Sequence, residues 1–253
     1  MIGRHVMSMQ KRSRWSRYVS GFVFLSLLLS IVYTIIQWAN APVTPPGPEY
    51  EKLKSDYALM VVQCFLGILA MLLPGLLARK WRLEIPSGMM ILYLLFLYAA
   101  IYLGEVQSFY YRIPHWDMIL HGFSGGMLGA LAFSFVRLLN KFDRVHLYLS
   151  PLFTAIFAFC FSITLGVFWE FYEYSADYML GLNMQKFLME DGTALIGRKA
   201  LSDTMQDLIT DAIGAVFTSS IGYVSLKYKK GWVEKVMLKR QPAQEQREIS
   251  ASG

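Results

Sequence analysis

Six long apolar stretches constrain the fold of this chain more than any other feature of its sequence. They occupy residues 21–38, 58–78, 87–103, 116–139, 151–174 and 204–226. An α-helix needs about 20 apolar residues to cross the hydrocarbon core of a bilayer, and each stretch is close to that length. Charged residues make up 17% of the chain, which is below the roughly 25% that is usual in soluble domains. The sequence therefore predicts an all-α polytopic membrane protein, a bundle of about six transmembrane helices.

The chain divides into one membrane domain and two basic tails. Residues 1–20 and 227–253 are predicted to be cytoplasmic tails around a transmembrane domain at 21–226, and the second tail is predicted to be partly disordered. The first apolar stretch is followed by Ala39 and Ala41, as a signal peptide would be. Its apolar core is longer than that of a signal peptide, however, and Pro42 would directly follow the cleavage site. We therefore interpret this stretch as an uncleaved membrane anchor.

The distribution of basic residues predicts how the chain is oriented. Lys and Arg are dense in the two tails and in the second and fourth loops, around positions 79–82 and 137–144. The other loops are less basic or match their Lys and Arg with acids. Because cytoplasmic loops carry the excess of Lys and Arg, both termini are expected on the cytoplasmic side of the cell membrane. The net charge of +6 then reflects topology and attraction to anionic lipid at the tails, and not binding to nucleic acid.

Acidic residues gather at the ends of three apolar stretches that this topology places on the outer side. Asp117 and His121 are four residues apart in the fourth stretch, so they share one helix face. The fifth and sixth stretches each carry one acidic stripe by the same spacing argument: Glu170, Glu173 and Asp177, and Asp203, Asp207 and Asp211. A carboxylate near the centre of a membrane helix costs about 2.5–3.5 kcal/mol. Acidic stripes and an imidazole at one end of the bundle therefore predict a polar pocket at the outer face.

The individual acids differ in how strongly they indicate a function. Asp117 and Asp203 stand at predicted helix starts, so two roles stay open for them: capping backbone N–H groups or lining the pocket. Asp177 and Glu105 are expected to be solvated at the membrane interface. The pocket role is favoured for the other four acids. Glu170 and Glu173 lie at the C-terminal end of a predicted helix, where the helix dipole disfavours a negative charge. Asp207 and Asp211 lie beyond the positions at which an acid caps a helix.

Small residues predict that the helices behind this pocket pack closely. Gly122 with Gly126, and Gly125 with Gly129, are each four residues apart in the fourth stretch, and Gly214 lies in the sixth. Small residues let two helix backbones approach each other. We therefore expect the fourth and sixth helices to draw their polar groups together, although ordinary helix packing explains the same pattern.

The chemistry that suits such a pocket is the binding of a divalent metal. Several carboxylates close together need a counter-cation or protons, and carboxylates with one imidazole suit Mg²⁺, Mn²⁺ or Zn²⁺. The predicted metal ligands are Asp117, His121, Glu170, Glu173, Asp207 and Asp211.

Two further roles are assigned around this metal. Glu170, Glu173 and Asp207 are the candidate catalytic groups, because a metal there would polarise a phosphoryl group and activate water. Arg198 and Lys199 are expected in the outer loop before the sixth stretch, where they are candidates for binding a phosphate or a lipid headgroup. A solvated loop pair explains these two basic residues equally well.

The same residues carry a resemblance to known membrane proteins. The pattern resembles the YjdF-like family of uncharacterised bacterial inner-membrane proteins, in order and across residues 116–222: Asp117-x-x-x-His121, Trp169-Glu170-x-x-Glu173 and Asp203-Thr204-x-x-Asp207-x-x-x-Asp211-x-x-Gly214-Ala215. The chain is more remotely similar to VanZ-like membrane proteins, from which it departs at Glu173 and Asp211. The first resemblance implies a multi-pass inner-membrane protein, and it implies no particular reaction.

Three functions stay open, and they disagree on whether the protein is an enzyme. One is a metal-dependent enzyme that acts on a lipid or lipid-linked phosphate at the outer face. Another is a proton- or cation-coupled transporter, although the span below Asp211 continues with the apolar residues Ile213, Val216 and Phe217. The third is a non-catalytic lipid-binding or scaffold protein whose acids cross-link helices. Membrane lipids are the expected partners in each case, and the sequence leaves the oligomeric state open.

Overall fold

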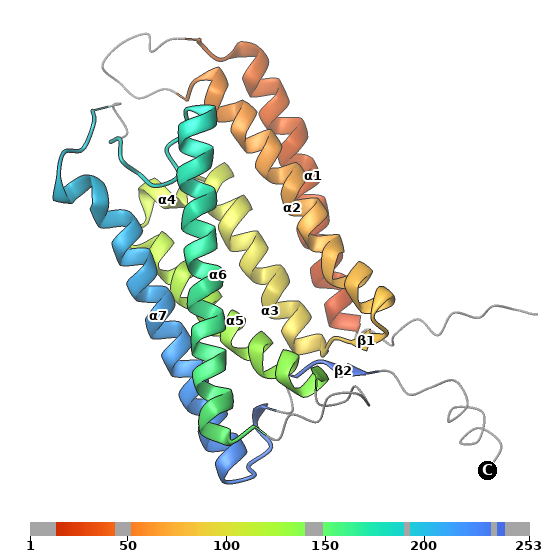
Figure 1. Cartoon of the computed structure of the whole chain (residues 1–253). Coiled ribbons are helices and arrows are strands. Elements are labelled where there is room, and N and C mark those ends of the chain that lie inside the picture. The colour runs from red at the N-terminus through yellow and green to blue at the C-terminus, as the bar shows by residue number, and fades with distance from the viewer. Residues whose placement is uncertain (1–13, 44–51, 140–148, 190–192, 234–236, 241–253) are drawn as a thin grey trace, which may run out of the picture.

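The computed structural model describes residues 14–43, 52–139, 149–189, 193–233 and 237–240. Long helices dominate this part of the chain (Figure 1). They are α1 (Arg14–Asn40), α2 (Lys54–Lys80), α3 (Ser87–Leu97) continuing into the π-helix η1 (Tyr98–Val106), the short α4 (Phe109–Arg112), α5 (Trp116–Leu139), α6 (Pro151–Leu180) and α7 (Arg198–Lys227). With α3 and η1 counted as one segment, six of the described helices are long and apolar enough to cross a membrane. The predicted all-α bundle of about six transmembrane helices is confirmed.

Two helices extend beyond their apolar stretches at the end that carries the acids. The sequence predicts helix ends at residues 174 and 204, but α6 continues to Leu180 and α7 begins at Arg198. Hydropathy marks only the part of a helix that meets hydrocarbon, whereas the backbone hydrogen bonds continue until a cap stops them. In α6 the Ser150 hydroxyl caps the start by accepting a bond from the Phe153 N–H, and Gly181 ends the helix in the left-handed conformation.

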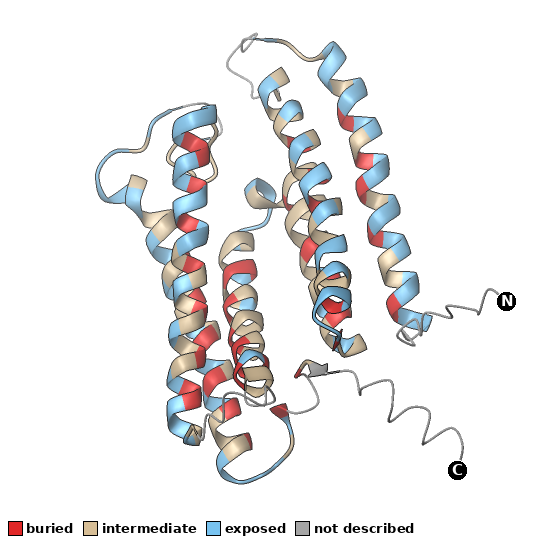
Figure 2. Ribbon diagram, turned by 45° about the vertical axis from the view of Figure 1, so that its right-hand side comes forward, coloured by how far each residue is buried: buried red, intermediate tan, exposed pale blue. Residues whose placement is uncertain are grey.

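The membrane helices form two groups of three (Figure 1). The first group, α1, α2 and α3–η1, packs around an apolar cluster of Val23, Leu27, Cys64, Met90 and Leu94. The second group, α5, α6 and α7, has its own cluster, which includes Ala132, Phe133, Ala155 and Ala158. The two groups meet mainly through η1, α4 and α5. Figure 2 shows that the outward faces of the helices are exposed, as expected where lipid is the solvent.

The segment after α7 returns to the bundle. Val233 and Met237 are buried in the same cluster as Phe133. The strand β2 (Lys239–Arg240) then pairs antiparallel with β1 (Leu83–Glu84) between α2 and α3. Hydropathy gives no sign of this ladder, because only two residues on each side take part. The predicted basic and disordered tail ends, at 1–13 and 241–253, lie outside the described residues, as do 44–51 and 140–148.

Glycines bring α5 and α7 close together, as the small-residue pattern predicts. A Cβ added at Gly125 would collide with the backbone of Asp211, and one added at Gly214 would collide with the carbonyl group of Gly122. The Ser162 hydroxyl of α6 donates a 2.7 Å hydrogen bond to the Gly125 carbonyl oxygen. Polar residues of three helices are therefore brought within reach of one another.

Candidate functional site

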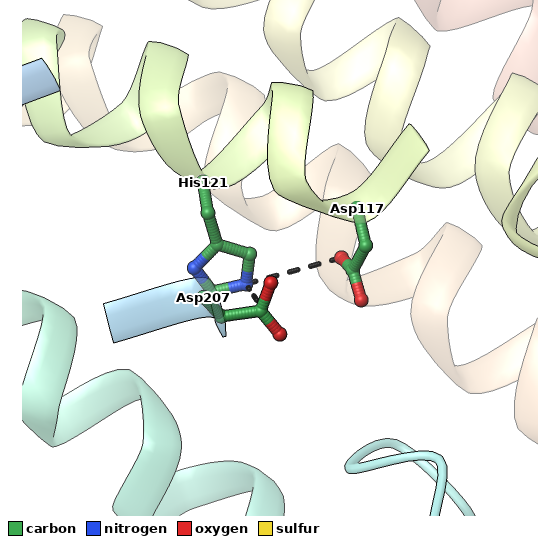
Figure 3. Close-up of side chains that lie close together, drawn as sticks. All are labelled: Asp117, His121 and Asp207. Atoms are coloured by element: carbon green, nitrogen blue, oxygen red, sulfur yellow. Dashed lines mark ion pairs between the residues drawn. The ribbon is translucent and has the colours of Figure 1, made fainter. Parts of the chain in front are cut away.

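His121 of α5 lies at the centre of a buried group of acids. Its side chain is surrounded by carboxylates from its own helix and from α7, and only 7% of the residue is exposed. The ring atom Nε2 lies 3.9 Å from Asp117 Oδ1 and 3.9 Å from Asp207 Oδ2 (Figure 3). On the other side of the ring, Nδ1 lies 3.3 Å from Asp211 Oδ2. The imidazole therefore lies between Asp117, one turn away on its own helix, and two acids of α7.

Three of these side chains are close enough to be considered as ligands of one metal ion. One donor atom each from Asp117, His121 and Asp207 lie within 4.8 Å of one another. Metal–donor distances of about 2.0–2.2 Å allow two ligands of one ion to be at most about 4.4 Å apart. A shift of a few tenths of an ångström in these side chains would therefore fit the donor set to a divalent ion.

Asp211 stands behind the imidazole and not beside Asp207. Its Oδ1 accepts a 3.1 Å hydrogen bond from the Ser124 hydroxyl, while Oδ2 faces His121 Nδ1. A Cβ added at Gly166 of α6 would lie 2.5 Å from Asp211 Oδ2, so the glycine leaves the space that this carboxylate fills. A carboxylate on one ring nitrogen fixes the orientation of a histidine whose other nitrogen binds a metal. Asp211, predicted as a ligand, lies at Nδ1 of His121, whereas Asp117 and Asp207 lie nearer to Nε2.

The α6 acids are buried next to this cluster but differ in their partners. Glu173 is 6% exposed, and its Oε1 accepts a 2.8 Å hydrogen bond from the Trp169 indole. Glu170 is 4% exposed, and neither of its carboxylate oxygens has a hydrogen-bond partner in the described chain. The same is true of both oxygens of Asp207, which is 1% exposed. Buried carboxylates without partners are costly, so these two indicate a missing ligand or a bound proton.

Sequence reasoning missed one cation that belongs to the cluster. Lys186, in the loop between α6 and α7, forms an ion pair with Asp117, and its Nζ lies 3.6 Å from Asp203 Oδ1. The same Nζ lies over the ring of Tyr110 of α4, at 5.2 Å from its centroid. Burial raises the pKa of the Tyr110 phenol well above its usual value, so this ring stays neutral. The acids indicate that a counter-cation is needed. The spacing of residues in the sequence, however, does not predict which acid a lysine in a loop will contact.

The loop that carries Lys186 is held in place by hydrogen bonds. Both oxygens of Asp177 accept bonds from backbone N–H groups of the loop, at 2.7 Å from Met184 and 2.9 Å from Gln185. The Asn183 side chain both donates to and accepts from the backbone of Leu188. Asp177 is therefore 8% exposed, and the expectation that it is solvated at the interface is wrong. The loop folds back onto the helix end because this carboxylate supplies the acceptors that its backbone needs.

Two other acids lie elsewhere than expected. Glu105 was expected to be solvated, but it is partly buried and its Oε1 accepts a 2.9 Å hydrogen bond from the Gln63 amide. Asp203 lies in the second turn of α7, so it does not cap that helix.

The basic pair also lies elsewhere than expected. Arg198 and Lys199 form the first turn of α7 in place of the outer loop, and both are exposed. The corrections for Asp203 and for the basic pair share one cause, which is that α7 begins six residues before its apolar stretch.

Comparison with known proteins places this architecture in a family. The family described as "Predicted membrane protein (DUF2238)" matches residues 50–228. The chain belongs to this family. The matched residues of the DUF2238 domain include every side chain of the cluster around His121 and the loop that carries Lys186.

One curated relative in this comparison comes from Thermotoga maritima and is described only as an uncharacterised protein. It is 31% identical over 142 residues, which are 55% of this chain and 64% of the relative, so the match spans a little under two thirds of the relative's length. No solved structure matches the chain. The comparisons establish a family of membrane proteins without assigning it a reaction.

Proposed function

We propose that this membrane protein holds a divalent cation beside His121 and uses it to hydrolyse a phosphate ester or anhydride on a lipid or lipid-linked substrate. The observation that carries the proposal is the carboxylate of Asp207. It is 1% exposed, neither oxygen has a hydrogen-bond partner in the described chain, and it faces His121 Nε2 beside Asp117. A positive charge next to a buried carboxylate stabilises its ionised form.

The proposed ligands are Asp117, His121 and Asp207, with Asp211 as the orienting group. Asp211 on Nδ1 would hold the imidazole with its Nε2 lone pair toward the ion. Two carboxylates and one imidazole suit Mg²⁺, Mn²⁺ or Zn²⁺. With three protein ligands, positions would stay open for water and for a substrate oxygen.

Glu170 is the proposed general base. Neither of its oxygens has a partner at hydrogen-bond geometry in the described chain, and the groups that interact with its charge include His121, Asp207 and the Gln185 amide. A water oxygen would bond to phosphorus while the bond from phosphorus to the leaving oxygen breaks. The water proton would pass to Glu170, and the leaving oxygen would take a proton from solvent. Glu173, which Trp169 holds by a hydrogen bond, is assigned to support the site and not to take part in proton transfer.

A scaffold is the second candidate function, and Lys186 favours it. Its ion pairs with Asp117 and Asp203 already supply one positive charge, so the acids would then only fasten the loop and helices together. One lysine leaves Glu170 and Asp207 without hydrogen-bond partners in the described chain, which is why we prefer the metal. A transporter is less well supported, since the buried residues of α7 beyond Asp211, such as Ala215 and Ser219, carry no ionisable group that could continue an ion path.

The orientation in the membrane belongs to the proposal as well. The positive-inside rule supports cytoplasmic termini, which would place the cluster at the outer face of the cell membrane and the basic tails against anionic lipid. The likeness to YjdF-like proteins, drawn from the acids and His121, supports a bacterial inner membrane as the location.

Metal analysis of the detergent-purified protein tests the proposal. We expect about one divalent ion per chain in the wild type and loss of most of it in Asp207→Asn and His121→Ala, because each change removes one of three ligands. Glu84→Gln, at the opposite end of the bundle in β1, is the matched control and should keep its metal. Phosphate release from a lipid-linked pyrophosphate should fall in the same two variants. Equal metal contents in all four proteins would rule out the site.

A further inference from the structure

A polar cavity lies in the first group of helices, at the same end of the bundle as the acidic cluster. Its volume is about 260 Å³, and it is bounded by α1, the start of α2, the end of η1, and α4. Its polar lining comes from Tyr33, Lys52, Tyr57, Gln107, Ser108 and Arg112. Among the described residues that line this cavity there is no acid, in contrast to the cluster around His121.

The two cations of this cavity are not neutralised by the part of the chain that the structure describes. Neither Lys52 nor Arg112 has a carboxylate within 4.0 Å there. Burial lowers the pKa of Lys52 most, the charges of Glu105 and Asp56 raise it, and the smaller effect of the Arg112 charge lowers it. The charged form of Lys52 has thus lost part of its water and faces a like charge. An anion between these two side chains would compensate both effects.

The position of the cavity indicates what kind of anion it meets. Lys52 stands two residues before α2, and Arg112 stands six residues after η1, so both lie where membrane spans end. Lys and Arg at this level reach toward the phosphate groups of the lipid headgroups. A cavity of about 260 Å³ is smaller than the roughly 300–1,000 Å³ that encloses a drug-sized ligand. It therefore suits a headgroup with its acyl chains left outside.

We infer that this cavity binds a phosphate group, carried by a membrane phospholipid or by a small soluble phosphate. Lys52 and Arg112 bind the phosphate oxygens, and Ser108 and Gln107 line the space beside them. The site is separate from the proposed metal centre and does not depend on it. The short helix α4 nevertheless connects the two, because Arg112 lines the cavity while Tyr110 lies under Lys186 of the acidic cluster.

Native mass spectrometry of the full-length protein in detergent tests this inference with three probes. Dioctanoyl phosphatidylglycerol carries both phosphate and acyl chains, dioctanoylglycerol lacks the phosphate, and glycerol phosphate lacks the chains. The variant is Lys52→Gln with Arg112→Gln. The matched control is Lys54→Gln, which removes a nearby lysine that lies over Trp38 and does not line the cavity.

The inference expects phosphatidylglycerol to bind the wild type and the Lys54→Gln control equally. Loss of two charge-assisted contacts should weaken its binding to the double variant about tenfold or more. Dioctanoylglycerol should bind wild type and double variant alike. Glycerol phosphate binding as tightly as the lipid would assign the site to a soluble phosphate, and much weaker binding would assign it to a headgroup. Unchanged phosphatidylglycerol binding in a folded double variant overturns the inference, and an unfolding midpoint close to that of the wild type shows that the variant is folded.

Discussion

The two groups of helices have similar outer surfaces and different interiors. The first group buries apolar side chains around Val23, Leu27 and Leu94, and its buried polar groups include Ser30 and Thr34, which bond within their own helix. The second group buries an imidazole and several carboxylates, with Asp207 and Asp211 at 1% and 2% exposure. Apolar packing is sufficient to hold three helices together in a membrane. The buried charges of the second group are therefore an added cost that a function explains.

The largest difference that we expect between the two groups concerns their glycines. Gly214→Ala should destabilise the protein by about 3 kcal/mol or prevent folding, because the new methyl group meets the backbone of Gly122, which cannot move aside. Gly67→Ala is the matched change in the first group, where the methyl group meets only the Ile101 and Leu27 side chains. It should cost about 1 kcal/mol, since side chains can repack. Thermal unfolding in detergent measures both, and equal losses would remove this contrast.

An intermediate effect is expected for the lysine that neutralises the acids. Lys186→Met leaves Asp117 and Asp203 without their cation, and we expect a loss of about 1–2 kcal/mol in metal-free protein, since the pair is partly exposed. Added Mn²⁺ should restore more stability in this variant than in the wild type, because the ion replaces the lost charge. Lys54→Met, over Trp38 in the first group, is the control and should show neither effect. Thermal unfolding with and without Mn²⁺ gives both numbers; a Mn²⁺ response no larger than that of the wild type would argue against a cation site.

The smallest effects on stability are expected when a single hydroxyl group is removed from the interior of either group of helices. Ser124→Ala removes a hydroxyl that lies 3.1 Å from Asp211 Oδ1 and 2.9 Å from the His121 carbonyl oxygen of its own helix, and it should cost about 1–2 kcal/mol, because one of these two acceptors is charged. Thr34→Val in α1 should change stability by less than about 0.5 kcal/mol, since the Thr34 hydroxyl bonds only to backbone carbonyls of its own helix. Unfolding midpoints of the two variants, measured side by side, test this. A larger loss in Thr34→Val would contradict the contrast between the interiors.

Much of the candidate site could be predicted, because it lies on helices whose periodicity is visible in the sequence. The four-residue spacing of Asp117 and His121 correctly places them on one face, and the glycines of α5 and α7 explain why Asp207 and Asp211 reach that face. The spacing could not tell on which side of the imidazole each acid lies. Asp207 and Asp211 have the same local pattern, and only the side of the imidazole on which each one lies separates them.

The sequence by itself determined the all-α membrane bundle and its six spans, because the length and hydropathy of a span are local properties that the bilayer imposes on each helix separately. Tertiary structure alone decided that Lys186 returns to pair with Asp117, that Asp177 binds the backbone of its own loop, and that Lys52 and Arg112 share one cavity. These contacts join loops to helices or one helix to another. They depend on how the chain closes in space, which no local pattern of residues encodes.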